Sequence, residues 1–124
     1  NYGDHIRDFT YIEDVVKIIK KILLKIPKKN KKWNEFNPSS SSSPFRILNI
    51  GNGKKVKLLK YIDYIEKNLK KKAKIKYLPK QPGDVRVSLA STKELRKLIK
   101  YVPKVNANVG VKKFIDWYKS FYIK

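Results

Sequence analysis

The sequence predicts a mixed α/β fold of three to four helices and short strands. Apolar residues recur at helical spacing in four segments, and short apolar runs end at glycine or proline turns. Hydrophobic residues make up 41% of the chain, which is enough for a folded core. The 124 residues fit one domain or part of one. No apolar stretch approaches the roughly 20 residues that a membrane-spanning helix needs.

Helical periodicity defines the longer elements. The first predicted helix, Glu13–Ile26, has acidic residues in its first turn and lysines toward its end, as the helix dipole favours. Pro27 then stops it. Further helices are predicted at 58–69, at 92–99 and at 111–121, where apolar residues again repeat every three or four positions.

Short extended segments connect these helices. Residues 1–12 are predicted to form a loop that leads into a short extended piece. The run FRILNI at 45–50 is a predicted buried strand that ends at the turn Gly51-Asn52-Gly53. Alternation of apolar residues with lysines predicts a half-exposed strand at 73–77, and a further extended piece follows at 85–89.

The charge of the chain is strongly positive. The formal net charge is +21, with 27 lysines and four arginines, and the usual partner of such a chain is a polyanion. Lysine, isoleucine and asparagine have AT-rich codons, however, and readers of base sequence favour arginine, so codon drift on solvated helix faces explains the charge better. We therefore expect no specific nucleic-acid partner and no membrane partner. A basic nucleic-acid-binding module is the alternative from another functional class.

The Lys- and Ser-rich residues 28–44 are predicted to form a flexible surface loop.

Most catalytic and metal-binding signatures are missing from the sequence. There is no cysteine, and the single histidine, His5, is expected on the surface or in a loop rather than at a metal. Val56 stands where a dinucleotide-binding loop that began at Gly51 would have its third glycine, so we interpret this segment as a plain strand-to-helix turn. Without a secretory signal, and with Asn1 in place of an initiator, we expect a cytoplasmic protein that begins upstream. The residues alone give no complete active site.

One segment with binding chemistry precedes the first helix. Arg7 is one of few arginines in a lysine-rich chain, and a guanidinium at this place can clamp a phosphate with two hydrogen bonds. The alternative is structural: Asp8 or Asp14 caps the helix, and Arg7 has no ligand.

A second such segment surrounds the turn at 81–86. Gln81 and Asp84 offer an amide and a carboxylate, which suit hydroxyl and ribose recognition, while Arg86 suits an anion. The alternative is that Gly83 shapes a turn and nothing binds there.

Four motifs occur together in an order and at a spacing that are similar to those of a known family. They are RDFTYIEDVV at 7–16, FRILNIGNG at 45–53, QPGDV at 81–85 and VGVKKFIDWYKSFY at 109–122. With them the chain resembles the C-terminal third of the NAD-dependent nucleotide-sugar epimerases and dehydratases of the extended short-chain dehydrogenase/reductase family. The QPGDV form and the aromatic ending are most similar to bacterial UDP-glucuronate 4-epimerases of capsule and lipopolysaccharide sugar biosynthesis.

The resemblance implies that residues 1–124 are the C-terminal substrate-binding region of such a fold, without its N-terminal Rossmann domain that binds NAD. The family performs hydride chemistry with a Tyr-x-x-x-Lys pair, and no tyrosine of this chain supplies one. The implied function is that of one part of an NAD-dependent 4-epimerase, an isomerase, with this segment inactive and free of cofactor by itself. A nucleotide-sugar dehydratase or a UDP-glucuronate decarboxylase is the alternative within the family.

The resemblance also implies roles for single residues. Arg7 matches the arginine that grips the nucleotide diphosphate, and Asp84 matches the acid at the nucleotide ribose. Gln81 takes a position where many relatives have an arginine on the same nucleotide, and Ser88 matches a further substrate-side position. Arg86 is expected at the UDP-sugar as well. The apolar faces of the first helix and of the strand at 45–50 imply a partner, either the missing domain or a second copy of the chain.

Overall fold

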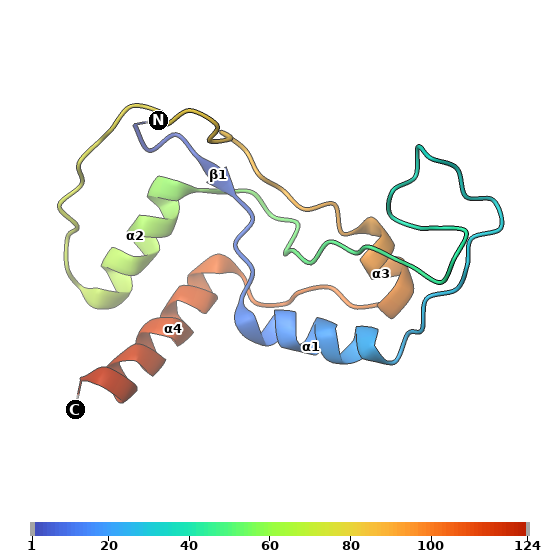
Figure 1. Ribbon diagram of the computed structural model, residues 1–124. Helices are drawn as coiled ribbons and strands as arrows, with labels where there is room; N and C mark the ends of the chain where they lie inside the picture. The colour runs from blue at the N-terminus through green and yellow to red at the C-terminus, as the bar shows by residue number, and fades with distance from the viewer. Residues whose placement is uncertain (1, 124) are drawn as a thin grey trace.

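The computed structural model describes residues 2–123. Figure 1 shows an elongated molecule in which two pairs of helices lie at opposite ends of a central strand. The elements follow in the order β1 (Ile6–Arg7), α1 (Ile12–Leu23), β2 (Val56–Lys57), α2 (Leu58–Leu69), α3 (Lys93–Ile99) and α4 (Ala107–Tyr122). The predicted mixed α/β class with three to four helices is confirmed. None of the helices within residues 2–123 has the length and apolar character to cross a membrane.

Helix α1 packs on α3 and forms the main core of the molecule. Ile18 of α1 and Leu95 and Ile99 of α3 are buried, and the partly buried residues around them are Ile22, Leu48, Ile50, Leu98 and Tyr101. The helix ends at Leu23, three residues before the predicted end at Ile26. Pro27 disfavours helical geometry in the residue before it, which limits the helix on this side.

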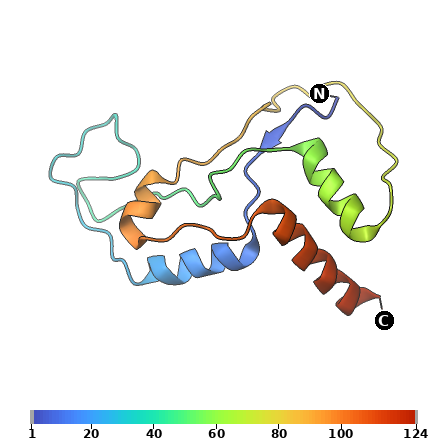
Figure 2. The ribbon, with the colours of Figure 1, turned by 180° about the vertical axis from the view of Figure 1, so that it is seen from behind.

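Helices α2 and α4 pair at the other end of the molecule, as the views in Figures 1 and 2 agree. Val111 and Ile115 of α4 are buried in this pair. Asn106 caps α4, because its side-chain oxygen accepts a hydrogen bond of 3.0 Å from the backbone N–H of Val109. A Cβ at Gly110 would lie 3.2 Å from the ring of Tyr11, so the glycine allows α4 to start close to the segment that leads into α1.

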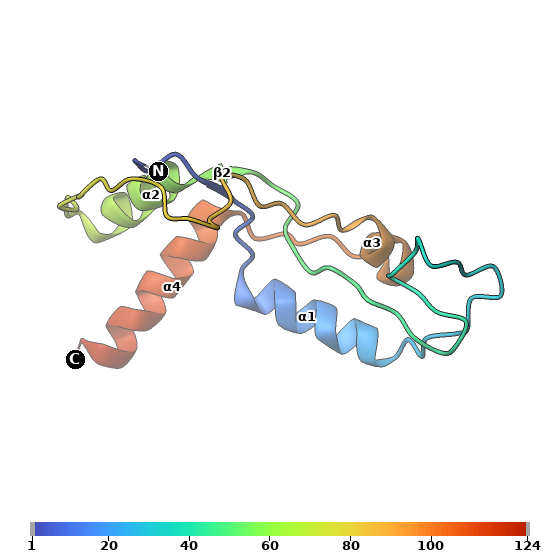
Figure 3. The same cartoon turned by 45° about the horizontal axis from the view of Figure 1, so that its top comes forward.

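A short sheet joins the two ends. β1 pairs with β2 in antiparallel register, with Ile6 opposite Lys57, and Figure 3 shows this pairing beside the start of α2. Ile6 also forms a parallel bridge with Val87, so the extended piece predicted at 85–89 lies along β1. Because Ile6 pairs with a segment on each of its two edges, the backbone of β1 is held in place there.

Two predicted strands are wrong. Residues 45–50 and 73–77 lie outside every strand of the described chain, and Arg46 makes only an isolated bridge with Ser40. A strand needs a neighbour to satisfy its backbone N–H and C=O groups, and residues 2–123 offer none at these places. The surface loop at 28–44 bonds mainly to itself, for example from the backbone N–H of Asn30 to the carbonyl of Ser41 at 2.8 Å.

The molecule exposes more surface than a compact protein of its size. Its accessible surface is 9938 Å², whereas a compact monomer of this mass exposes about 6900 Å². Two apolar faces contribute. Val16, Ile19 and Leu23 project from α1, and the exposed aromatic residues of α4 are Phe114, Trp117, Tyr118, Phe121 and Tyr122. Within residues 2–123 nothing covers these faces.

Candidate functional site

The carboxylate of Asp84 is the centre of the site. Its Oδ1 lies 2.9 Å from Nη2 of Arg7, and its Oδ2 lies 2.9 Å from Nε2 of His5. His5 and Arg7 are two positions apart in extended backbone, which places both side chains on the same side of β1. Gly83, at φ +79°, turns the chain so that Asp84 faces them. The carboxylate side chain stays one-third exposed.

Arg7 is held in place but keeps donors for a ligand. Its Nη1 donates to the backbone carbonyls of Ile6 at 3.0 Å and Arg86 at 3.2 Å, while Nη2 donates to Asp84. The Nε–H and one Nη2–H therefore have no partner in residues 2–123. A guanidinium that is fixed in this way can bind an anion without losing further side-chain freedom.

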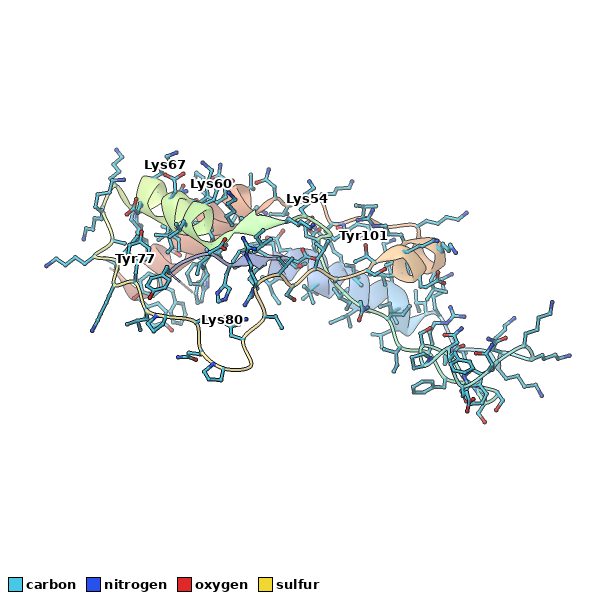
Figure 4. All side chains as sticks on the ribbon, turned by 90° about the horizontal axis from the view of Figure 1, so that it is seen from above. Lys54, Lys60, Lys67, Tyr77, Lys80 and Tyr101 are labelled. Atoms are coloured by element: carbon cyan, nitrogen blue, oxygen red, sulfur yellow. The ribbon has the colours of Figure 1, made fainter. Side chains whose placement is uncertain are left out.

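A hollow of about 380 Å³ opens beside this pair. His5, Gln81 and Asp84 give it a polar end, and its apolar wall comes from α2 and from residues 75–79. Tyr77 belongs to that wall, and in Figure 4 it lies on the loop beyond α2, together with Lys80. The hollow therefore combines an apolar surface with an amide, a carboxylate and, next to them, a guanidinium. Such a combination suits a polar, anionic small molecule with an apolar part.

Three of the predicted site residues do not line the hollow, and of these only Arg7 pairs with a residue that does, Asp84. The Nε of Arg86 pairs with Oδ2 of Asp4 at 2.8 Å, and both side chains are largely exposed. Ser88 uses its backbone N–H, which donates to the carbonyl of Ile6 at 3.1 Å. Gln81 and Asp84 thus line the hollow and Arg7 pairs with Asp84 beside it, whereas Arg86 and Ser88 neither line the hollow nor pair with a predicted site residue through their side chains.

Asp8 and Asp14 have structural roles, but neither is a cap of α1. The N-cap of α1 is Tyr11, without a side-chain hydrogen bond. Asp8 instead accepts hydrogen bonds from the backbone N–H groups of Asn52 and Gly53, at 3.0 Å each. Asp14 accepts from the hydroxyl of Tyr101 at 2.5 Å and from the N–H groups of Lys104 and Val105. The predicted capping role is therefore wrong: each carboxylate joins segments far apart in sequence.

The contacts of Asp14 change two ionisation equilibria. Burial opposes its charged form, but the hydrogen bonds from Tyr101, Val105 and Lys104 and the charge of Lys17 outweigh burial, so the pKa of Asp14 lies below its ordinary value. The same hydrogen bond, together with burial and the negative charge of Asp14, raises the pKa of Tyr101 to about 12.

The glycine turn at 51–53 does not fit a bound dinucleotide. A Cβ at Gly51 would lie 2.5 Å from Cβ of Ala90 and 2.6 Å from Oδ2 of Asp8, so the glycine is needed for close packing of protein segments. The N–H groups of Asn52 and Gly53, which would face a pyrophosphate in such a loop, are already bonded to Asp8. The segment is therefore a packed turn, but the predicted strand before it is absent, and the N–H groups of Asn52 and Gly53 are not available to a pyrophosphate. Residues 2–123 also contain no group of three potential metal ligands.

Sequence reasoning missed His5. It was expected on the surface or in a loop, and it does lie outside every helix and strand of the described chain, but it is only 7% exposed and is paired with Asp84. The signal that could have found it is its spacing of two from Arg7 in an extended segment. Asp84, its partner, is 79 positions away, and spacing along the chain does not reveal such a contact.

Comparison with known proteins shows what this arrangement is similar to. No protein-family model matches the chain. A crystal structure of UDP-glucuronic acid 4-epimerase from Bacillus cereus, in complex with UDP-glucuronic acid and NAD, is similar over 97% of this chain and 34% of its own chain, with a TM-score of 0.73 and 26% identity. Over nearly its whole length the present chain is similar to the C-terminal third of nucleotide-sugar epimerases and dehydratases of the extended short-chain dehydrogenase/reductase family.

Two curated relatives make the comparison more specific. Protein CapI of Staphylococcus aureus is 38% identical over 126 residues, which cover all of this chain and 38% of CapI. UDP-glucuronate 4-epimerase 1 of Arabidopsis thaliana is 36% identical over 124 residues, which cover 98% of this chain and 28% of that enzyme. The chain thus spans about a third of the length of the relatives that it matches. The predicted resemblance is confirmed.

Proposed function

We propose that residues 1–124 form the C-terminal substrate-binding region of an NAD-dependent 4-epimerase that acts on UDP-glucuronate, and that they hold the nucleotide of the substrate. The observation that carries the proposal is the Arg7–Asp84 pair at the edge of a partly apolar hollow. The names of the relatives support the choice of substrate, since proteins at 34–36% identity are called UDP-glucuronate 4-epimerases.

The proposed division of work among the side chains follows from their chemistry. Arg7 supplies positive charge and two further N–H donors to the diphosphate, and Asp84 accepts hydrogen bonds from ribose hydroxyls. Gln81 adds an amide at the same hollow. We also propose that Arg86 contacts the substrate, which requires its ion pair with Asp4 to break first. Ser88 is proposed as a substrate contact on the resemblance alone.

The contribution of this chain to catalysis is binding and orientation. When the nucleotide is anchored, the sugar is the part of the substrate that moves. Fixing the nucleotide lowers the entropic cost of bringing the sugar to the reacting groups. The hydride chemistry belongs to NAD, and the turn at 51–53 does not fit it, because its N–H groups already donate to Asp8. We infer that the rest of a longer protein binds NAD, and that the protein works in the cytoplasm.

The exposed surface supports a covering partner. The chain exposes about 3000 Å² more than a compact monomer, and this excess is as large as an extensive protein interface. The apolar stripe of α1, with Val16 and Ile19, is one part of it. We propose that the NAD-binding region of a longer protein covers this face, and that a second copy of the chain can do so when that region is missing.

Turnover by the protein that contains this segment tests the function. The longer protein is assayed with UDP-glucuronate and a panel of other UDP- and dTDP-sugars, as wild type, Arg7→Ala and Arg46→Ala. Arg46 is a matched control, because it is also an arginine but lies beside the surface loop, far from the hollow. We expect UDP-glucuronate to be epimerised, Arg7→Ala to raise KM by about tenfold or more, and Arg46→Ala to behave as wild type. Absence of turnover with every nucleotide sugar would refute the proposal.

A further inference from the structure

His5 has a defined environment that the proposed function does not yet use. The residue is buried in a chain with a net charge of +21, and its backbone is fixed by the N–H of Leu58, which donates to the carbonyl of His5 at 2.8 Å. Its Nε2 lies 2.9 Å from Asp84, on the oxygen that Arg7 does not use. The imidazole and the guanidinium therefore hold the carboxylate from two directions.

The chemistry of the two groups determines which atom carries the proton. An ionised carboxylate only accepts hydrogen bonds, so at this distance Nε2 of His5 must be the donor. The donor is either the protonated imidazole or the neutral tautomer that has its hydrogen on Nε2. In both forms the hydrogen bond goes to a charged group, and such a bond contributes more than one between neutral groups.

We propose that His5 is a positioning residue for the nucleotide site: its Nε2–H fixes the orientation of the Asp84 carboxylate, and through Asp84 that of Arg7. The inference rests on the proposed function for its consequence, which is tighter binding of a nucleoside diphosphate. With two oxygens held by two donors, Asp84 cannot rotate about its side-chain bonds, and its remaining lone pairs keep one direction toward the hollow.

The loss of His5 has a definite expected consequence. Without the Nε2 donor, Oδ2 of Asp84 loses its partner, and Gln81 and Lys76 line the same hollow as Asp84. A carboxylate held only by Arg7 can turn toward the lysine or into solvent, since it is already one-third exposed. Arg7 would keep its two backbone carbonyls but lose a fixed partner on Nη2.

The first test needs no nucleotide. NMR spectra of the chain report the carboxyl carbon of Asp84 and the guanidinium signals of Arg7, and His5 gives one unambiguous set of imidazole signals because it is the single histidine. We compare wild type with His5→Phe, which removes the donor, and His5→Gln, whose amide nitrogen reaches a similar distance. We expect both sets of signals to move in His5→Phe and to stay close to wild type in His5→Gln. Unchanged Asp84 and Arg7 signals in His5→Phe would overturn the proposal.

The second test measures coupling. UDP is titrated into wild type, His5→Phe, Asp84→Asn and the double variant. We expect His5→Phe to weaken UDP binding by about threefold to tenfold and to add nothing in the Asp84→Asn background, because a positioning residue acts through its partner. An undiminished effect in that background would contradict the proposal.

The two tests separate the two claims. If wild type does not bind UDP, turnover by the longer protein still decides the proposed function, and the Asp84 and Arg7 signals decide the role of His5. If His5→Phe does not fold, Asp84→Asn tests the same contact by changing the acceptor instead of the donor. The ring nitrogen signals of His5 must then move, because Nε2–H has lost its charged acceptor, and unmoved signals would overturn the proposal.

Discussion

Asp14 and Asp84 are both carboxylates with several hydrogen-bond donors, yet their surroundings differ. Asp14 is 1% exposed and receives a tyrosine hydroxyl and two backbone N–H groups, which join α1 to the segment between α3 and α4. Asp84 is one-third exposed and receives two side chains, His5 and Arg7, at the edge of a hollow. Backbone donors belong to the fold and cannot leave without unfolding, whereas side-chain donors can be shared with a ligand.

The difference separates the carboxylates of this chain that hold the fold from the one at the proposed binding site. The acids of the segment 7–14 serve the fold, because Asp8 and Asp14 accept hydrogen bonds from main-chain N–H groups of distant segments. Asp84, the acid of the segment 81–86, pairs instead with two side chains. Substitutions at the two kinds of carboxylate should therefore affect different measurements.

The largest effect is expected at Asp14. Asp14→Ala leaves the N–H groups of Lys104 and Val105 and the hydroxyl of Tyr101 without their acceptor in a buried place. We expect the free energy of unfolding to fall by about 3 kcal/mol, measured by urea denaturation. Tyr101→Phe removes one of the three bonds and should cost about 1 kcal/mol. Equal costs for both variants would contradict the role of the backbone donors.

Gly51→Ala should destabilise the fold by about 2 kcal/mol. The new Cβ would meet Ala90 and Asp8 at 2.5 and 2.6 Å, and both belong to packed segments. Gly83→Ala is the matched control: its Cβ would have nothing within 4 Å, so its cost comes from the positive φ alone and is about 1 kcal/mol. A smaller loss at Gly51 than at Gly83, by thermal unfolding, would show that the junction around Asp8 is loosely packed.

The Asp14–Tyr101 contact should make the free energy of unfolding depend on pH in both the acidic and the alkaline range. The pKa of Asp14 is lower in the folded chain than in the unfolded chain, so its contribution is present above about pH 4 and is lost as the pH falls. The pKa of Tyr101 is raised to about 12, so its contribution is present below about pH 10 and is lost as the pH rises toward 12. Urea denaturation from pH 2 to 11 should show both slopes reduced in Asp14→Asn, and slopes identical to wild type would exclude this contact as their source.

The smallest effect is expected at Asp116, a third kind of carboxylate. It pairs with Lys112 one helical turn away, and both side chains are more than half exposed. Asp116→Asn should change the free energy of unfolding by no more than about 0.5 kcal/mol. A larger loss in the same urea experiment would mean that exposed pairs, too, hold this fold.

The helices were predictable because their signals are local. Residues 13–26 and 111–121 carry apolar periodicity that a single element satisfies, and helices α1 and α4 lie there. The strand predicted at 45–50 was wrong because a strand depends on a neighbour, and the described chain does not contain one for it. Its apolar residues Leu48 and Ile50 nonetheless pack on the α1–α3 core. Hydrophobicity thus predicted burial there, but not the type of backbone.

The site was predictable only in part, for a similar reason. Arg7 and Asp84 were identified by residue type and by resemblance, and the fold brings them to 2.9 Å. His5 escaped because a lone histidine has no signal until its partner is known. Asp8 and Asp14 were assigned to a helix cap because proximity in sequence suggested it, whereas their partners are the backbone groups of distant segments. Contacts between residues that are far apart in sequence become visible only in the folded structure.

A UDP titration followed by NMR tests the central claim, that Asp84 serves binding whereas Asp14 serves the fold. The chain is compared as wild type, Asp84→Asn and Asp116→Asn, with the free energy of unfolding measured on the same samples. We predict that wild type binds UDP with a dissociation constant of about 1 mM or weaker, because one wall of the site is present. Asp84→Asn should bind at least about fivefold more weakly at nearly unchanged stability, and Asp116→Asn should match wild type in both. Wild-type affinity for UDP in Asp84→Asn, or a loss of stability in that variant as large as that in Asp14→Ala, would contradict the account.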